Sequence, residues 1–177
     1  LKIPINLEIG PTNEMLKIAL KYLPDSICIV PEKRKEITTE GGLNLNQNFN
    51  KIKKIVKKLK KKNIRVSLFI EPKIKDIKIA KKLNIDCVEL HTGKICNLIN
   101  KKKNIIIEIN KLKKSVMYAS NSGLEVHAGH GITFNSAKIL SRIKGISEYN
   151  IGHFIVGESI FIGLKETIKK FKEILKK

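Results

Sequence analysis

Several features are scarce in this sequence of 177 residues, and each absence narrows what the protein can be. Tryptophan is absent, and no run approaches the roughly 20 consecutive apolar residues that a membrane-spanning helix needs. The first residues, LKIPINLEIG, lack the basic-then-apolar order of a secretion signal. We therefore expect a cytoplasmic protein with no membrane partner.

Cysteine is also scarce, which bears on disulfides and metals. The three cysteines are Cys28, Cys87 and Cys96, and the sequence has no CxxC pair and no histidine at metal-ligand spacing. A disulfide framework and a zinc site are therefore not indicated, and we expect no metal. Cys28 and Cys87 lie in apolar runs, so we interpret them as small core residues in a reducing compartment.

Arginine is rare although the formal net charge is +20. Only three of the 36 basic residues are arginines, namely Arg34, Arg65 and Arg142. Arginine is the usual residue for two-pronged recognition of bases and phosphates, and the lysines are spread over nearly every predicted helix. We expect a solvated lysine surface and no nucleic-acid partner. A basic nucleic-acid-binding domain, with strongly salt-dependent binding to polyanions, is the alternative.

Six short apolar runs alternate with longer segments of helical period, which is the pattern of repeated βα units on a parallel sheet. The predicted strands span residues 3–9, 26–30, 64–70, 86–90, 123–128 and 150–156, and they read as apolar on both faces. The helical segments each carry one apolar stripe, such as Ile52, Ile55, Val56 and Leu59. No GxGxxG loop follows the first strand to favour a doubly wound nucleotide-binding sheet.

This alternation predicts an α/β fold, a (β/α)8 TIM barrel of which about six βα units, the third to the eighth, are present. A closed barrel of this kind typically needs about 250 residues, so the chain is short by about two units. It also begins with leucine rather than methionine. We expect residues 1–177 to form a single barrel domain that is incomplete at its N-terminus.

Two carboxylates stand at predicted strand ends, where the reactive groups of such barrels lie. Glu8 belongs to INLEIG and Glu89 to DCVELHTG. A carboxylate on an otherwise apolar strand needs a partner or a raised pKa, and it can then act as a general base near neutral pH. A salt-bridged structural role is the alternative reading of both residues.

Histidine and glycine gather at two further strand ends. VHAGHGIT places two of each at a strand-to-loop transition, which makes His130 a candidate for proton transfer and His127 a packing residue. NIGHFIVGES places Gly152 and His153 at the last strand before a helix start, a position that suits a phosphate. Ordinary turns, one of them carrying a surface histidine, are the alternative.

The segment PEKRKEITTEGGL is longer than a simple connection of about 2 to 6 residues, which favours a ligand-facing or lid role. Arg34, Thr38 and Thr39 are suited to hydrogen-bond a sugar phosphate. A purely solvated loop is the alternative.

Taken in order and at their intervals, the motifs NLE, VPEKRKEITTEGGL, VSLFI, VELHTG, AGHGIT and NIGHFIVG resemble the pyridoxine 5'-phosphate synthase family over essentially the whole chain. The resemblance implies a barrel enzyme, assembled as a homo-octamer, that works in vitamin B6 biosynthesis. It condenses 1-deoxy-D-xylulose 5-phosphate with 3-amino-2-oxopropyl phosphate into pyridoxine 5'-phosphate, phosphate and water. It uses no cofactor and no metal.

The resemblance also implies roles for single residues. Glu8 matches the family's acid-base glutamate, His130 its proton-donating histidine, and Glu89 the carboxylate that stabilises charged intermediates. Four residues match substrate contacts: Thr38 to the deoxyxylulose phosphate, and Gly131, Gly152 and His153 to the aminoacetone phosphate.

Two parts of the family pattern have no match here. The family's first strand carries an Asn and an Asp-His pair, and its second strand supplies a further catalytic histidine with nearby arginines. His127 also stands where an Asn is more usual. A degenerate, non-catalytic subunit that survives as an assembly partner is therefore the alternative function.

Overall fold

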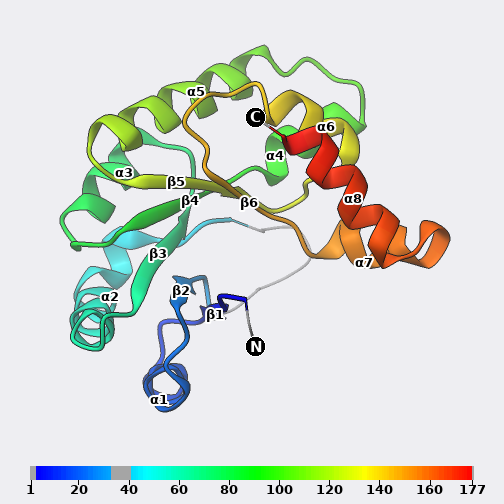
Figure 1. Cartoon of the computed structure of the whole chain (residues 1–177). Coiled ribbons are helices and arrows are strands. Elements are labelled where there is room, and N and C mark those ends of the chain that lie inside the picture. The colour runs from blue at the N-terminus through cyan, green and yellow to red at the C-terminus, as the bar shows by residue number, and fades with distance from the viewer. Residues whose placement is uncertain (1–2, 33–40, 177) are drawn as a thin grey trace.

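The structure is a computed structural model that describes residues 3–32 and 41–176. Its strands form one sheet in chain order, in which every neighbouring pair is parallel. They are β1 (Asn6–Ile9), β2 (Ser26–Ile29), β3 (Arg65–Ile70), β4 (Cys87–His91), β5 (Glu125–Gly129) and β6 (Glu148–Asn150). All six carboxyl ends therefore lie along one edge, and within the described residues no strand joins β6 to β1 (Figure 1).

The described residues also form eight helices, which follow the strands along the chain (Figure 1). They are α1 (Asn13–Tyr22), α2 (Leu45–Lys60), α3 (Ile74–Lys81), α4 (Gly93–Asn100), α5 (Ile106–Asn121), α6 (Phe134–Leu140), α7 (His153–Ile162) and α8 (Leu164–Leu175). Three of them begin at a side chain that accepts a hydrogen bond from the first turn: Thr12, Asn44 and Thr133. None of the helices in the described ranges is long and apolar enough to cross a membrane.

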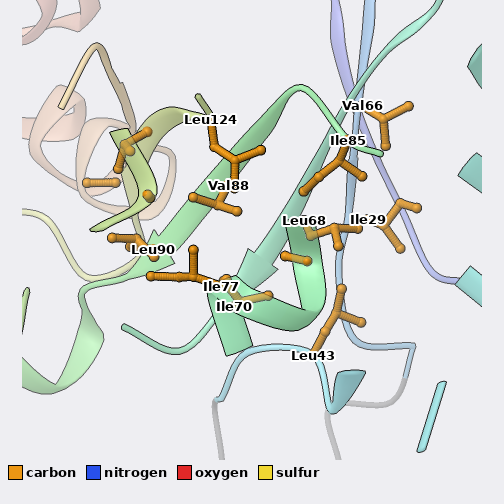
Figure 2. Close-up of a cluster of buried hydrophobic side chains, with 14 of the residues drawn as sticks. Ile29, Leu43, Val66, Leu68, Ile70, Ile77, Ile85, Val88, Leu90 and Leu124 are labelled. Carbon is orange, nitrogen blue, oxygen red and sulfur yellow. The ribbon is translucent and has the colours of Figure 1, made fainter. Parts of the chain in front are cut away.

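The hydrophobic core lies between the outer face of the sheet and the helices that cover it. Ile29, Leu68 and Leu90 of three neighbouring strands are fully buried, and they share a cluster with Ile77 of α3 (Figure 2). The stripe predicted on α2 is confirmed, because all four of its residues are buried. Sequence periodicity thus located this layer correctly.

The opposite face of the sheet is polar, so the prediction that the strands are apolar on both faces is wrong. Successive side chains of a strand point to opposite faces, and the residues that alternate with the core positions are Glu8, Cys28, Ser67, Glu89, His127 and Asn150. The register pairs Glu8 with Cys28 and Glu89 with His127. No helix of residues 3–32 and 41–176 covers this inner face, and several of its polar groups contact one another.

The last predicted strand is wrong beyond its first residue. β6 ends at Asn150, and His153 begins α7. The run HFIV is short and apolar, and such a run fits a strand or a helix equally well. Apolar residues occur on several sides of α7, where Ile160 is 80% and Phe161 84% exposed, so no amphipathic stripe marked it as a helix.

Three phenylalanines connect the C-terminal helices to the rest of the fold. The ring centroid of Phe134 on α6 lies 4.6 Å from that of Phe171 on α8 and 5.0 Å from that of Phe154 on α7. The rings of Phe154 and Phe171 are 5.8 Å apart. Aromatic contacts of this kind stabilise the fold by more than their buried area alone would give, so the cluster holds α7 in place after β6.

Candidate active site

Glu89 occupies the middle of β4 and is buried, with 3% of its surface exposed. The side-chain amide of Asn150 donates a 2.7 Å hydrogen bond to its Oε2, and the Cys28 thiol donates a longer one of 3.4 Å to the same oxygen. Its Oε1 lies against Gly129, where an added Cβ would come within 1.8 Å. The donors therefore come from β2 and β6, each two strands away from β4, and the adjacent β5 provides the space for this carboxylate.

Burial raises the pKa of Glu89, and the negative charge of Glu8 raises it further. The hydrogen bonds from Asn150 and Cys28 act in the opposite direction, because they stabilise the ionised form. A carboxylate with a raised pKa is a stronger base than an ordinary glutamate, which favours a role in proton transfer. Glu8, which is exposed, thus lies on the same inner face and acts on Glu89 through its charge.

Cys28 is buried, as expected of a small core residue, but its side chain faces the site. Burial, followed by the charge of Glu89, raises the pKa of the thiol well above its ordinary value. The thiol therefore stays protonated and donates to Glu89 rather than acting as a nucleophile.

His130 follows β5 directly and has a left-handed backbone conformation, with φ of 77°. Gly131 continues this conformation with φ of 74°. The Thr92 hydroxyl lies 2.8 Å from the carbonyl oxygen of His130, to which it donates, and the His130 ring lies 5.0 Å from that of His91. Backbone and side chain of His130 are therefore both held by the end of β4.

Gly152 and His153 are exposed and lie just beyond Asn150, at the start of α7. Among the described residues no side chain caps this helix, so the N–H groups of its first turn, which have no partner within the helix, are not bound by a capping side chain. The helix dipole makes the same end electropositive. An added Cβ at Gly152 would meet nothing within 4 Å, which leaves the approach to these N–H groups open.

A second polar cluster lies on the same face towards the start of the strands. Cys87, Glu125 and His127 have ligand atoms within 4.8 Å of one another. Glu125, however, is already paired with Arg65, and burial raises the pKa of Cys87 to about 11. A metal ion would need the thiolate and would have to displace the guanidinium, so we assign this cluster a structural role.

The sequence pattern of the family described as "Pyridoxal phosphate biosynthesis protein PdxJ" matches residues 1–177. The chain belongs to the PdxJ family. A pyridoxine 5'-phosphate synthase from Pelagibacter ubique (strain HTCC1062) is 59% identical over 176 residues, which are 99% of this chain and 74% of that protein. Another from Sulfurihydrogenibium sp. (strain YO3AOP1) is 45% identical over 173 residues, 98% of this chain and 70% of that protein. The family resemblance is thereby confirmed.

Two solved structures resemble the fold of this PdxJ chain. The tryptophan synthase A-subunit from Pyrococcus furiosus superposes with a TM-score of 0.62 at 15% identity, over 97% of this chain and 66% of that one. The 3-hexulose-6-phosphate synthase from Salmonella typhimurium gives 0.55 at 14% identity, over 96% and 85% of the two chains. At such identities the likeness concerns the fold alone.

Among the residues predicted for the PdxJ site, the structure brings Glu8 and Glu89 to one face, where Glu8 is exposed and its charge adds to the effect of burial on the pKa of Glu89. His130 follows Gly129, whose backbone borders the Glu89 carboxylate. Gly152 and His153 lie on the neighbouring connection, two and three residues after the Asn150 that binds Glu89. Thr38 lies outside the described residues, as do Arg34 and Thr39.

Sequence reasoning gave no role to three residues of the site in the PdxJ chain. Asn150 contacts Glu89 from two strands away, and Glu71 lies 2.9 Å from His91 across the ends of β3 and β4. These contacts depend on strand register, which a single sequence does not fix. The available signal for His91 was its place two residues after Glu89, on the same face of β4.

Proposed function

We propose that this chain carries the catalytic site of a pyridoxine 5'-phosphate synthase. It condenses 1-deoxy-D-xylulose 5-phosphate with 3-amino-2-oxopropyl phosphate into pyridoxine 5'-phosphate, phosphate and water, and it needs neither metal nor cofactor. The observation that carries the proposal is the buried carboxylate of Glu89, whose Oε1 lies against Gly129 directly before His130, in a chain 59% identical to a protein of that name.

The chemistry consists of proton transfers that accompany addition, dehydration and the elimination of one of the two substrate phosphates, which leaves as inorganic phosphate. The amine of one substrate adds to the ketone of the other, and loss of water leaves a cationic imine. The Glu89 carboxylate stabilises that positive charge across the inner face. Glu8 removes the carbon-bound proton, and His130 donates a proton to each hydroxyl that leaves as water.

The phosphate of 3-amino-2-oxopropyl phosphate rests on backbone amides. Gly131 in its left-handed conformation and the uncapped start of α7 at Gly152 and His153 present such amides on neighbouring connections. Thr38, which lies outside the described residues, is assigned to the phosphate of the sugar substrate from the family resemblance alone. The absence of side chains at the two glycines lets the anion approach the main chain closely.

The six βα units correspond to the third to eighth units of a (β/α)8 barrel. Support comes from the open order β1 to β6 and from relatives that are longer, since the chain covers 74% and 70% of two of them. The proposal extends to a cytoplasmic homo-octamer. Three buried free thiols suit a reducing compartment, and the exposed apolar residues of α7 suit burial in an assembly.

The test is formation of pyridoxine 5'-phosphate from the two substrates. This chain is compared alone and fused to the part of the Pelagibacter relative that the match leaves out. The proposal expects product from the fusion, and loss of at least about 100-fold in Glu8→Gln, whereas Glu173→Gln, an exposed glutamate on α8, keeps the rate. A folded fusion without product would favour the degenerate subunit.

A further inference from the structure

Glu71 and His91 form a carboxylate–histidine pair beside the site, and neither residue has a role in the function proposed above. Glu71 directly follows β3, and its Oε1 lies 2.9 Å from Nδ1 of His91, the last residue of β4. The same oxygen accepts a 3.0 Å hydrogen bond from the N–H of Gly42. The His91 side chain is 7% exposed, so the pair is largely shielded from water.

The protonation state of Glu71 fixes which nitrogen of His91 carries hydrogen. The hydrogen bond from His91 lowers the pKa of Glu71 to about 2, with burial opposing and the Gly42 N–H adding to the effect. An ionised carboxylate only accepts hydrogen bonds, so Nδ1 must be the donor. The other nitrogen, Nε2, is buried and has no hydrogen-bond partner among the described residues.

Nε2 of His91 borders the ring of His130. An added Cβ on Gly93 would lie 2.7 Å from that nitrogen and 2.8 Å from Cδ2 of His130, so both ring edges meet over this glycine. The ring centroids are 5.0 Å apart with an interplanar angle of 54°. On its other side His91 packs edge-on against Phe69 at 5.2 Å, which leaves it little freedom to turn.

We propose that His91, oriented by Glu71, is a positioning residue that holds the His130 ring in place for proton donation. The inference rests on the proposed function, because that function gives His130 its role. His130 has a left-handed backbone, which is unfavourable for a residue with a side chain, and its ring edge meets that of His91 over Gly93. The Glu71–His91 pair supports the ring, while the Thr92 hydroxyl supports the carbonyl.

The experiment combines steady-state kinetics of the active fusion with nitrogen-15 spectra of the histidine rings. Glu71→Ala removes the acceptor, and Glu71→Gln keeps an oxygen for both donors. Glu108→Ala is the matched control, because Glu108 lines the same pocket of about 160 Å³ but pairs with Lys94 and Lys111. Thermal unfolding establishes that each variant is folded at the assay temperature.

We expect His91 to carry its hydrogen on Nδ1 in the wild type and in Glu71→Gln, and to lose this preference in Glu71→Ala. Together with this loss, we expect kcat of Glu71→Ala to fall about 10- to 100-fold while KM stays within about threefold of the wild type. The ring signals of His130 should shift in the same variant. Glu71→Gln and Glu108→Ala stay within about fivefold in kcat.

Hydrogen on Nε2 of His91 in the wild type would overturn the inference, as would His130 signals or kcat that Glu71→Ala leaves unchanged. A wild-type fusion that forms no product would instead defeat the proposed function. In that case the nitrogen-15 ring spectra still test whether Glu71 and His91 position the His130 ring, because they do not depend on enzyme activity.

Discussion

The carboxylate of Glu89 lies where a side chain at position 129 would have to be, with its Oε1 1.8 Å from the Cβ that Gly129 lacks. Gly129→Ala therefore forces Glu89 away from Asn150 and Cys28. We predict a fall in kcat of at least about 100-fold and a loss of about 1 to 3 kcal/mol in unfolding free energy.

The control for this substitution is Gly157→Ala. Gly157 lies inside α7, where an added Cβ meets nothing within 4 Å, so this change should stabilise the helix by about 0.5 to 1 kcal/mol. Rates and urea unfolding curves of the two variants give the comparison. A Gly129→Ala enzyme with wild-type kcat would show that Glu89 does not need its observed position.

Glu89 should make stability depend on pH. Its pKa is raised in the folded protein, mainly by burial, so its contribution is fully present below the pKa of the unfolded chain and is lost as pH rises through the folded pKa. Glu89→Gln should therefore be more stable than the wild type at pH 8, with a difference that shrinks towards pH 4, and it should be inactive. Urea unfolding across this range measures the difference. A constant difference at all pH values would mean that Glu89 is not the group responsible.

Glu71 should show the opposite dependence, because its pKa is lowered to about 2 by His91. Its contribution is present above the ordinary glutamate pKa and is lost as pH falls from about 4.5 towards 2. Its side chain is 31% exposed, so we expect Glu71→Gln to cost about 1 to 2 kcal/mol at pH 7 rather than the full value of the shift. Unfolding at pH 7 and at pH 3.5 should show a smaller cost at the lower pH, and an equal cost at both would contradict the assignment.

Phe154 connects the proposed phosphate site to the core through Phe134 and Phe171. Phe154→Ala should loosen the start of α7 and raise KM for 3-amino-2-oxopropyl phosphate about 3- to 10-fold, with a smaller change in kcat. Ile160→Ala is the comparison, because Ile160 lies on the same helix but is 80% exposed. Equal KM values in the two variants would show that the aromatic cluster does not contribute to phosphate binding.

The sequence predicted five of the six strands to within three residues at each end, because their β-branched runs are bounded by turns and helices of clear period. It did not predict the polar inner face, since alternation within strands of three to six residues is a weak signal. The helix at His153 was missed for a related reason, because α7 has no polar side to reveal its period.

Glu8, Glu89 and His130 were selected as site candidates because strand ends carry the chemistry of barrels. What surrounds them could not be selected in this way. The contact of Glu89 with Asn150 and the fit of its carboxylate over Gly129 join β4 to β5 and β6, and only the register of those strands defines them. The pairing of Glu71 with His91 has the same origin.

The most direct test of the central claim is the rate of pyridoxine 5'-phosphate formation by His130→Asn in the active fusion, measured at saturating concentrations of both substrates. If His130 donates the proton for dehydration, kcat should fall by about 100- to 10,000-fold while KM stays within about threefold. A folded variant whose kcat remains within about threefold of the wild type would contradict the account.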